Sequence, residues 1–366
     1  MKKNNPLLAL TMGDPAGVGP EIIAGAWKSF FLLKGGSGSD HACRPVVFGS
    51  SEIIRRAVEL RNTGEDVISI SSLSELDDDY FIRFGEKTIP CFDCCPKTTL
   101  EWFKESCARN SGLPEPKIDP RCGDAAFICL NRAIDFALSG QISAIVTGPL
   151  HKKSLNLAGH HYPGHTEILA ERCGIDDFAM MLYLGAQPSL ASPTGLAVVH
   201  TTLHTAMKNV FDQITEDAVV ARSHLIAGFM KKIMGSDPKI GVCALNCHNG
   251  EEGLFGDEEI RIIRPAVERA KKEGLNIAGP YPSDTLMLDA KKGFYDGIVA
   301  MYHDQGHIAV KLLDMHHAVN ITLGLPIIRT SVAHGTAFDR AWKGIAEITS
   351  MIEAVRVAMI LSRHSD

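Results

Sequence analysis

The chain has 366 residues, of which 45% are hydrophobic and 22% are charged, as in an ordinary folded protein long enough for two domains. Its formal net charge of −6 argues against general binding to nucleic acid or to an anionic membrane. The first apolar run, residues 7–10, is too short for the hydrophobic part of a signal peptide, and no later run is long enough to cross a membrane. We therefore expect a cytoplasmic protein that binds neither membrane nor nucleic acid.

Short apolar runs alternate with stretches of helical spacing along most of the chain. In chain order, strands are predicted at residues 7–12, 45–50, 142–149, 178–185, 195–201, 239–246 and 295–303. Helical spacing is clearest at residues 124–140, 215–234 and 257–274, and the polar residues 109–123 are predicted to form a surface loop before a helix. This alternation predicts an α/β fold with mostly parallel sheets covered by helices on both faces.

Cysteine is frequent but does not predict a disulfide framework or a zinc site. The segment "CFDCC" places Cys91, Cys94 and Cys95 close together, but it contains a single C-x-x-C pair. No second pair follows at the spacing of a structural zinc site. Reduced thiols are therefore the expected state.

Histidine is concentrated in one half of the sequence. Thirteen of the fifteen histidines lie between positions 151 and 334, and several follow apolar runs. His200 and His204 follow "LAVV", His248 follows "VCALN" and His303 follows "IVAMY". Ligands bind beyond the carboxyl ends of the strands in open α/β sheets, so residues at several strand ends can meet there.

Three of these residues, His204, His248 and His303, are candidate ligands of a catalytic metal, because neutral imidazole is a common ligand. The nearby carboxylates Asp304 and Glu251 could hold the second ring nitrogen of such ligands. A single histidine at a strand end is more often an ordinary polar residue. No compact metal motif in the sequence decides between the two interpretations.

A second group suits a phosphorylated substrate. Lys311, Asn320 and Arg329 lie in one segment rich in apolar residues, so both cations are expected to be largely buried and to need an anion. The alternative is that they are merely solvated, as such residues usually are. His165 and Thr166 lie at the expected start of a helix, where backbone N–H groups favour a negative ligand.

The glycine-rich segment "TMGDPAGVGPEII" follows a predicted strand and precedes a predicted helix. Its spacing, G-x-x-x-G-x-G, lacks the third glycine of the Rossmann fingerprint, and we reject that interpretation. A serine hydrolase is also disfavoured, because the sequence contains no G-x-S-x-G.

Several longer segments together resemble the 4-hydroxythreonine-4-phosphate dehydrogenase family. They include "TMGDPAGVGPEI", "IVTGPLHKKSLNLAGHHYPGHTE", "LNCHNGEEGLFGDEE", "MYHDQGHIAVK" and "VNITLGLPIIRTSVAHGTAFDRAWKG". The resemblance implies that the three candidate histidines bind a divalent metal (Zn²⁺, Co²⁺ or Mg²⁺). It also implies substrate contacts, which are His165, Thr166, Lys311, Asn320 and Arg329. Asp284 and Asp304 match acidic positions near the metal and, with Lys311, are the candidate catalytic groups.

The resemblance also implies a fold, a cofactor and an assembly. The family is similar to the isocitrate and isopropylmalate dehydrogenases, which have two α/β domains with a cleft between them. Here the domains would be residues 1–145 with 325–366, and residues 146–324, the latter carrying the metal and substrate site and a dimer interface. The cofactor would be NAD or NADP, bound by His334, Gly335, Thr336 and Asp339. The family pattern further implies a homodimer whose active site is shared between subunits.

The implied reaction is metal-dependent oxidation of the 3-hydroxyl of 4-hydroxythreonine 4-phosphate to a β-keto acid that loses carbon dioxide, as in pyridoxal phosphate biosynthesis. The segments "LAGHHYPGHTE", "GLFGDEE" and "HIAVKLL" are more similar to a second branch, implied to act on 4-phospho-D-threonate or 4-phospho-D-erythronate. A remote alternative is a phosphate acyltransferase or an inactive binding relative. The sequence does not distinguish 4-hydroxythreonine 4-phosphate from the substrates of the second branch, because all of them share a phosphate and a metal-binding hydroxyl.

Overall fold

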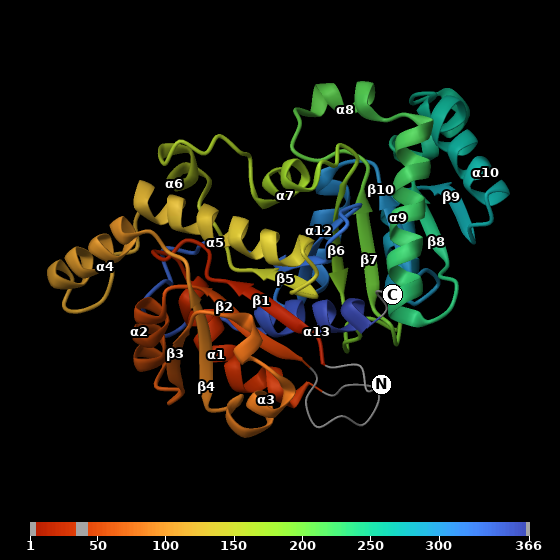
Figure 1. The fold of residues 1–366 in the computed structure, drawn as a ribbon. Coiled ribbons are helices and arrows are strands. Elements are labelled where there is room, and N and C mark those ends of the chain that lie inside the picture. The colour runs from red at the N-terminus through yellow and green to blue at the C-terminus, as the bar shows by residue number, and fades with distance from the viewer. Residues whose placement is uncertain (1–4, 34–42, 364–366) are drawn as a thin grey trace. The chain divides into compact units, whose positions relative to one another are not determined.

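The computed structural model describes residues 5–33 and 43–363 of the chain (Figure 1). Two units can be separated in it: unit 1 comprises residues up to 176 and from 325 onward, and unit 2 comprises residues 177–324. Both units consist of a sheet and helices, which confirms the predicted α/β class. None of the helices in the described ranges is long and apolar enough to span a bilayer.

The sheet of unit 1 is parallel in every pairing described. Its strands lie in the order β3-β4-β2-β1-β5-β12. Their bounds are β1 Leu7–Thr11, β2 Arg44–Gly49, β3 Asp66–Ile70, β4 Thr88–Asp93, β5 Ala144–Thr147 and β12 Arg329–Val332. Strands β1 and β5 are buried along their whole length, as expected for parallel strands covered by helices on both faces.

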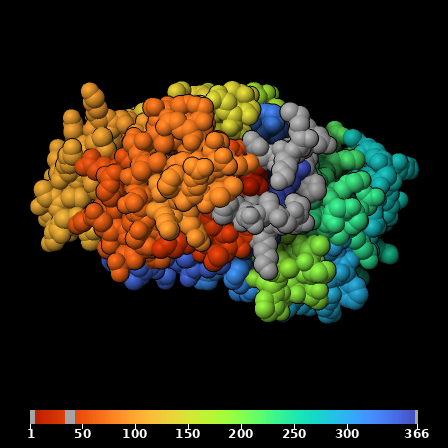
Figure 2. All heavy atoms as spheres, turned by 60° about the horizontal axis from the view of Figure 1, so that its bottom comes forward, coloured from red at the N-terminus to blue at the C-terminus, as the bar shows by residue number. Residues whose placement is uncertain are grey.

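The helices of unit 1 begin at residues suited to helix starts. Ser50 and Asp119 accept backbone N–H groups at the starts of two of them, and Pro20 lies in the first turn of another. Their bounds are α1 Gly19–Leu32, α2 Ser51–Arg61, α3 Asp78–Phe84, α4 Lys97–Arg109, α5 Pro120–Leu138, α6 Lys152–Leu157, α7 His165–Cys173 and α13 Thr349–Arg363, with a 3₁₀ turn at Leu73–Glu75. On the face shown in Figure 2, the orange part of the chain, which includes α3, forms much of the surface of unit 1.

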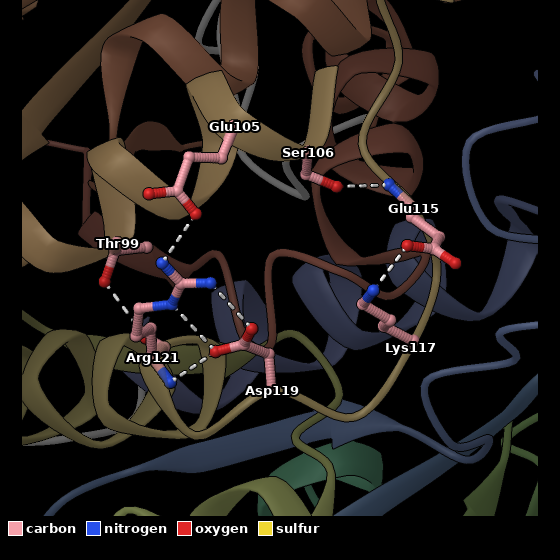
Figure 3. Close-up of polar contacts among 7 residues, drawn as sticks. All are labelled: Thr99, Glu105, Ser106, Glu115, Lys117, Asp119 and Arg121. Carbon is pink, nitrogen blue, oxygen red and sulfur yellow. Dashed lines mark hydrogen bonds and ion pairs between the residues drawn. The ribbon is translucent and has the colours of Figure 1, made fainter. Parts of the chain in front are cut away.

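The predicted surface loop at residues 109–123 is ordered by polar contacts (Figure 3). The Arg121 guanidinium donates to both carboxylate oxygens of Asp119 at 3.0 Å and to Glu105 on α4 at 3.1 Å. The Thr99 hydroxyl donates to the Arg121 carbonyl at 3.0 Å, so the start of α5 is tied to α4. The helix begins at Pro120, inside the range predicted as loop.

The sheet of unit 2 has the order β11-β6-β7-β10-β8-β9. Strand β6 is antiparallel to both of its neighbours, and the other described pairings are parallel, so "mostly parallel" is the correct description. The strand bounds are β6 Ala179–Leu184, β7 Leu196–His200, β8 Ile240–Cys243, β9 Ile277–Tyr281, β10 Gly297–Ala300 and β11 Ala318–Leu323.

The helices of unit 2 include a long one, α9, capped by the Thr215 side chain and ended by Gly235 in the left-handed region. The helix bounds are α8 Met207–Gln213, α9 Glu216–Met234, α10 Arg264–Lys272, α11 Ser283–Lys291 and α12 His303–Asp314, with a 3₁₀ segment η2 at Cys247–Gly253 and a π turn η3 at Glu259–Ile263. The predicted helix at residues 257–274 is therefore a π turn that leads into α10.

Some predicted strands extend too far: β8 ends at Cys243 instead of residue 246, and β10 is a second case. Residues 295–303 were expected to be extended, but β10 ends at Ala300 and α12 begins at His303. The Gln305 side chain accepts the Met301 N–H at 2.7 Å and donates to the Ala244 carbonyl at 2.8 Å. These bonds stabilise a turn directly after the strand, and the histidine enters the first turn of a helix.

Candidate active site

Parallel pairing of β7 with β10 brings two of the candidate histidines together in unit 2. His200, the last residue of β7, is opposite Ala300, the last residue of β10. The chain then continues on one side to His204 and on the other to His303, whose ring centroids are 6.0 Å apart. Both line a pocket of about 530 Å³, whose other lining residues are Leu203, Thr205, Met207, Val210, Tyr302 and Asp304.

His303 is arranged as metal-ligating histidines usually are. Its Nδ1 lies 2.7 Å from Oδ1 of Asp304, and a carboxylate accepts the ring N–H, which leaves Nε2 with a lone pair. Asp304, one of the candidate catalytic carboxylates, is exposed beside the pocket. The sequence prediction that a carboxylate would hold this histidine is supported for Asp304.

Two further histidines, His200 and His307, pack behind the pocket and were not assigned a role from sequence. His200 Nδ1 donates to the Met180 carbonyl at 3.3 Å, so its Nε2 accepts a hydrogen bond from His307 Nδ1 at 3.1 Å. The His307 ring stacks on His303 with centroids 3.8 Å apart.

Burial lowers the pKa of His200 to about 4 and that of His307 to about 3, so both are neutral at pH 7. The spacing of four residues between His303 and His307 could have indicated their contact on one helix face.

His248 has a different setting. It lies in η2 with φ of 52°, within a run of left-handed residues, and its ring is 6.5 Å from that of Phe255. The segment is fixed by Glu259, whose carboxylate accepts the backbone N–H groups of Leu245 and Asn246 at 2.8 and 2.7 Å. Among the described residues, no three His, Cys, Asp or Glu side chains are arranged to hold a metal ion.

The cationic candidate of unit 1 is buried. Arg329 is 2% exposed at the start of β12, and its guanidinium donates to the Thr147 hydroxyl at 2.7 Å. Desolvation lowers its pKa to about 9, opposed by the charge of Glu167, so it remains a cation at pH 7.

His165 and Thr166, the other candidates of unit 1, begin helix α7. Burial, and next the charge of Arg329, hold the pKa of His165 well below its usual range. His165 is thus neutral at pH 7 and near a buried cation. Together these residues offer a positive charge, a neutral imidazole and the start of a helix, which suits an anion.

The remaining substrate candidates lie in unit 2 and differ in exposure. Asn320 is half-buried on β11, with its amide nitrogen 3.5 Å from Met180 Sδ and its Oδ1 buried without a hydrogen-bond partner in the described ranges. Lys311 is exposed on α12, so the expectation that it would be buried is wrong. Two of its apolar neighbours on that helix, Ile308 and Leu312, are exposed as well. Asp284, at the start of α11, is also exposed and accepts the Thr285 N–H at 2.8 Å.

The glycine-rich segment near the N-terminus and the segment with the cofactor candidates lie against each other in unit 1. The Val18 N–H donates to the Thr336 carbonyl at 3.0 Å, and a Cβ on Gly17 would lie 2.9 Å from the Thr336 side chain. Only glycine permits this approach. The Trp342 indole also donates to the Pro15 carbonyl at 3.0 Å. We call residues 333–346 the C-terminal loop and residues 13–19 the N-terminal turn.

The cofactor candidates lie in the C-terminal loop. Thr336 is buried, Gly335 and Asp339 are exposed, and the His334 Nδ1 lies 2.9 Å from the Gly335 carbonyl. Glu21 of α1 holds the loop: its carboxylate accepts the N–H of Trp342 and, at 2.8 Å, that of Gly344. Sequence reasoning did not identify Glu21, although it lies within the glycine-rich segment "TMGDPAGVGPEII".

Asp14 in the N-terminal turn was also not singled out. It is fully buried, and its Oδ1 accepts the Ala16 N–H at 2.9 Å. Desolvation raises the pKa of Asp14 to about 7, opposed by the hydrogen bond from the Ala16 N–H. A buried carboxylate that is about half protonated at pH 7 is a feature that no pattern of residue types reveals.

The chain is similar to known proteins over nearly its whole length. The sequence profile of the family described as "Pyridoxal phosphate biosynthetic protein PdxA" matches residues 41–358. A D-threonate 4-phosphate dehydrogenase of Pectobacterium atrosepticum is 40% identical, over 97% of this chain and 99% of the relative. A 4-hydroxythreonine-4-phosphate dehydrogenase of Trichlorobacter lovleyi is 38% identical, over 99% of each chain.

Solved structures agree with these sequence relatives. The crystal structure of 4-hydroxythreonine-4-phosphate dehydrogenase from Klebsiella pneumoniae is 38% identical, covers 100% of both chains and superposes with a TM-score of 0.77. A terephthalate 1,2-cis-dihydrodiol dehydrogenase from Burkholderia xenovorans has 25% identity over 97% of this chain and 98% of the other, with a TM-score of 0.62. The resemblance seen in the sequence motifs is therefore confirmed, and the chain is a dehydrogenase that belongs to the PdxA family.

Proposed function

We propose that the enzyme oxidises the 3-hydroxyl of a four-carbon acid phosphorylated at C4, giving a β-keto acid that then loses carbon dioxide. The observation that carries this proposal is Arg329, a guanidinium that stays charged although it is 2% exposed. The planar guanidinium fork suits a phosphate, and Arg329 lies close enough to His165, at the start of α7, for its charge to lower the pKa of that imidazole. The neutral imidazole of His165 adds no competing charge.

Two acids that fit this description appear in the names of relatives, and 4-phospho-D-erythronate, a stereoisomer of the second, fits it as well. The first is 4-hydroxythreonine 4-phosphate, which the relative from T. lovleyi is named for, and the second is D-threonate 4-phosphate, which the P. atrosepticum relative is named for. They differ at C2, where one has an ammonium group and the other a hydroxyl. We assign the shared phosphate to Arg329, His165 and Thr166 of unit 1, and Lys311 and Asn320 of unit 2 stay substrate candidates on the family pattern.

A divalent cation (Zn²⁺, Co²⁺ or Mg²⁺) would be held by His204 and His303, with His248 as the third candidate. The first two fit this role, because they line one pocket and the His303 N–H is taken up by Asp304. When bound, such a cation would stabilise the negative charge that develops on the substrate oxygen. His307, stacked on His303, restricts the rotation of that ring.

Hydride transfer calls for a nicotinamide dinucleotide, NAD or NADP, which would accept the hydride from C3. We assign its binding to His334, Gly335, Thr336 and Asp339 in the C-terminal loop. Support comes from the attachment of this loop to the N-terminal turn through Thr336 and to helix α1 through Glu21. The exposed backbone at Gly335 leaves room for a ligand, because nothing lies within 4 Å of a Cβ built there.

The proton of the reacting hydroxyl needs an acceptor, for which Asp304 and Asp284 are the candidates, while Lys311 is the third candidate catalytic group. Asp304 lines the pocket but already accepts from His303, which fits a positioning role for it. Asp284 and Lys311 are both exposed side chains that can reach solvent and exchange the proton with it.

We also propose that the enzyme is a homodimer with an active site shared between subunits. Helix α12, which begins with His303, exposes Ile308 and Leu312, the latter by 82%, and the exposed Met315 follows directly after its last residue. These positions recur at helical spacing, so they form one apolar stripe on the outside of the helix. An exposed stripe of this kind is typical of a protein interface, and a second copy would bury it beside the pocket.

The reaction is tested by following the absorbance of reduced nicotinamide with each substrate, each dinucleotide, and with or without added divalent metal. We expect turnover with one of the two phosphorylated acids and none with its dephosphorylated form. Equal rates with and without the phosphate would contradict the assignment of Arg329. No reduced nicotinamide with either acid, in protein with a confirmed metal content, would contradict the proposed reaction.

A further inference from the structure

Three cysteine sulfurs meet in unit 1, away from the groups assigned above. The Sγ of Cys129 on α5 lies 3.4 Å from the Sγ of Cys94 and 3.6 Å from that of Cys95. All three are free thiols, and we call them the thiol triad. The segment "CFDCC" was noted in the sequence, but Cys129 comes from a different helix, and nothing in the spacing revealed it.

The surrounding structure holds these sulfurs in place. Cys94 and Cys95 directly follow β4, and the Cys94 N–H donates to the Gly49 carbonyl at 3.0 Å. Asp93, the last residue of β4, accepts from the Ser51 N–H and hydroxyl at 2.6 and 2.9 Å. On the other side, the Arg121 contacts tie α5 to α4 (Figure 3), which itself begins two residues after Cys95. The sulfur contacts therefore join two well-fixed elements.

The three thiols differ in how easily a small oxidant can reach them. Cys94 and Cys95 are half-buried, whereas Cys129 has no exposed surface. Hydrogen bonding from the two neighbouring thiols and burial hold the pKa of Cys129 well above its usual range. An oxidant should therefore react first with Cys94 or Cys95, and Cys129 is placed to react second.

We propose that the thiol triad is an oxidation site, at which a hydroperoxide links Cys129 to Cys94 or Cys95 by a disulfide. The thiol of Cys94 or Cys95 loses its proton, and its sulfur attacks one oxygen of hydrogen peroxide. The O–O bond breaks, the departing hydroxide takes up that proton as water, and a sulfenic acid forms. The sulfur of Cys129 then attacks the sulfenic sulfur, and its proton leaves with the hydroxyl group as a second water. Two thiols are oxidised and one peroxide is reduced, and a dithiol reductant reverses the change.

Because two half-buried thiols share one buried partner, the loss of a half-buried cysteine and the loss of the buried one should have different effects on disulfide formation. Loss of Cys94 leaves Cys95 able to form the bond with Cys129, and the reverse also holds. Loss of Cys129 removes the common partner. The disulfide joins residues 35 apart in the sequence, and closing a loop of that length restricts the unfolded chain. Oxidation should therefore raise the melting temperature by several degrees.

The full-length protein is treated with hydrogen peroxide in small excess, and disulfides are identified by intact mass and by mapping of cross-linked peptides. We expect a peptide pair joining Cys129 to Cys94 or Cys95, a higher melting temperature, and reversal of both by dithiothreitol. The cross-link should persist in Cys94→Ser and in Cys95→Ser and be lost in Cys129→Ser. Cys107→Ser, which removes a half-exposed thiol of α4 outside the triad, should behave as the wild type.

If Cys129→Ser does not fold, the double variant Cys94→Ser/Cys95→Ser leaves the buried position intact and should also lose the cross-link. The proposal is wrong if Cys129 remains a free thiol while Cys94 or Cys95 is oxidised to sulfinic acid. It is equally wrong if the cross-link found involves other cysteines. These outcomes do not depend on the substrate or cofactor.

Discussion

Several ionisable side chains of this enzyme are buried in settings that disfavour their charged forms. Desolvation is the main cause of the raised pKa of Asp14 and of the lowered pKa values of His165 and Arg329. All three lie in segments that the sequence motifs identified. Perturbed groups gather at functional sites more often than elsewhere, which supports the placement of the site.

Asp14 should make the stability of the protein depend on pH. Its pKa is about 7 in the folded protein, against 3.8 as the ordinary value. Between about pH 4 and pH 7 the unfolded chain has lost the proton and the folded chain keeps it, so the free energy of unfolding falls as pH rises through this window. The loss from this group is on the order of a few kcal/mol and is complete above about pH 7.

Replacing Asp14 by asparagine, which resembles the protonated acid, should remove this contribution. Urea unfolding of Asp14→Asn and wild type at several pH values from 4 to 8 should show a shallower decline for the variant. Asp79→Asn, a change at an exposed aspartate of α3, serves as the control and should follow the wild type. Identical pH slopes for Asp14→Asn and wild type would show that Asp14 titrates normally.

Arg329 should determine phosphate affinity. Truncating one partner of a buried charge pair typically costs about 2–5 kcal/mol of binding free energy. Arg329→Ala should therefore weaken binding of the phosphorylated substrate by roughly 30-fold or more. The measurement is the KM of the substrate together with calorimetric binding of inorganic phosphate. Arg340→Ala, a change at an exposed arginine of the C-terminal loop, should leave phosphate binding unchanged. An unaltered KM in Arg329→Ala would remove this residue from the site.

His303 should be needed for metal binding and not for folding. It is half-buried at the edge of a pocket, so His303→Ala creates little cavity in the core. Elemental analysis after dialysis against Zn²⁺ or Co²⁺ should show metal in the wild type and a strong reduction in the variant, with a similar melting temperature. His316→Ala changes an exposed histidine after α12 and should retain the metal. Full metal content in His303→Ala would exclude it as a ligand.

Among the elements, the C-terminal loop depends on helix α1 for its position. Glu21 accepts two backbone N–H groups of the loop, and Arg61 of α2 donates to the Gly344 and Ala346 carbonyls at 2.8 and 3.0 Å. Burial raises the pKa of Glu21, while these N–H groups and Arg61 oppose the rise. Donors and acceptors on both sides of the loop are thereby satisfied by side chains.

Glu21→Gln should loosen this loop, because the amide NH₂ would face one of the two N–H donors. We expect a loss of stability of about 1–3 kcal/mol and a higher KM for the nicotinamide dinucleotide, with a smaller change in substrate KM. Glu101→Gln, at an exposed position of α4, provides the comparison. A destabilised variant with an unchanged dinucleotide KM would mean that the loop does not bind the cofactor.

The sequence predicted those elements whose residues carry a strong local signal. Strands β1, β5 and β7 are short apolar runs buried on both faces, and they lie where predicted. Strand β3 alternates exposed and buried residues, and β9 contains glycine and proline, so neither resembles a continuous apolar run. Their pairing partners, which are distant in sequence, stabilise them instead.

The site was predictable in part for the same reason. His204 and His303 could be placed together because the carboxyl ends of neighbouring parallel strands meet. The contacts of His307 and His200 and the raised pKa of Asp14 depend on burial by side chains from other elements. Lys311 was expected to be buried because apolar residues surround it in the sequence, but that pattern belongs to the exposed stripe of α12.

At the scale of the whole molecule, the proposed homodimer would place the stripe of Ile308, Leu312 and Met315 at an interface. That stripe lies on the helix that begins with His303, so burying it would bring the partner's surface close to the pocket. If the site is shared, the metal histidines of one subunit act with the phosphate-binding residues of its partner. In such an arrangement, two inactive variants with lesions in different halves of the site should restore one active site when they form a mixed dimer.

A dimer formed from a His303→Ala subunit and an Arg329→Ala subunit would then have both lesions in one site and none in the other. The two inactive variants, unfolded together and refolded, should regain activity. Random pairing makes about half of the dimers mixed, each with one working site of two, so recovery should approach about a quarter of the wild-type rate.

The matched control is a mixture of the His204→Ala and His303→Ala variants. Because these two residues line one pocket of a single chain, every site of that mixture keeps a lesion and no activity should return. If the first mixture also stays inactive although mass spectrometry shows mixed dimers, each active site is built from one chain.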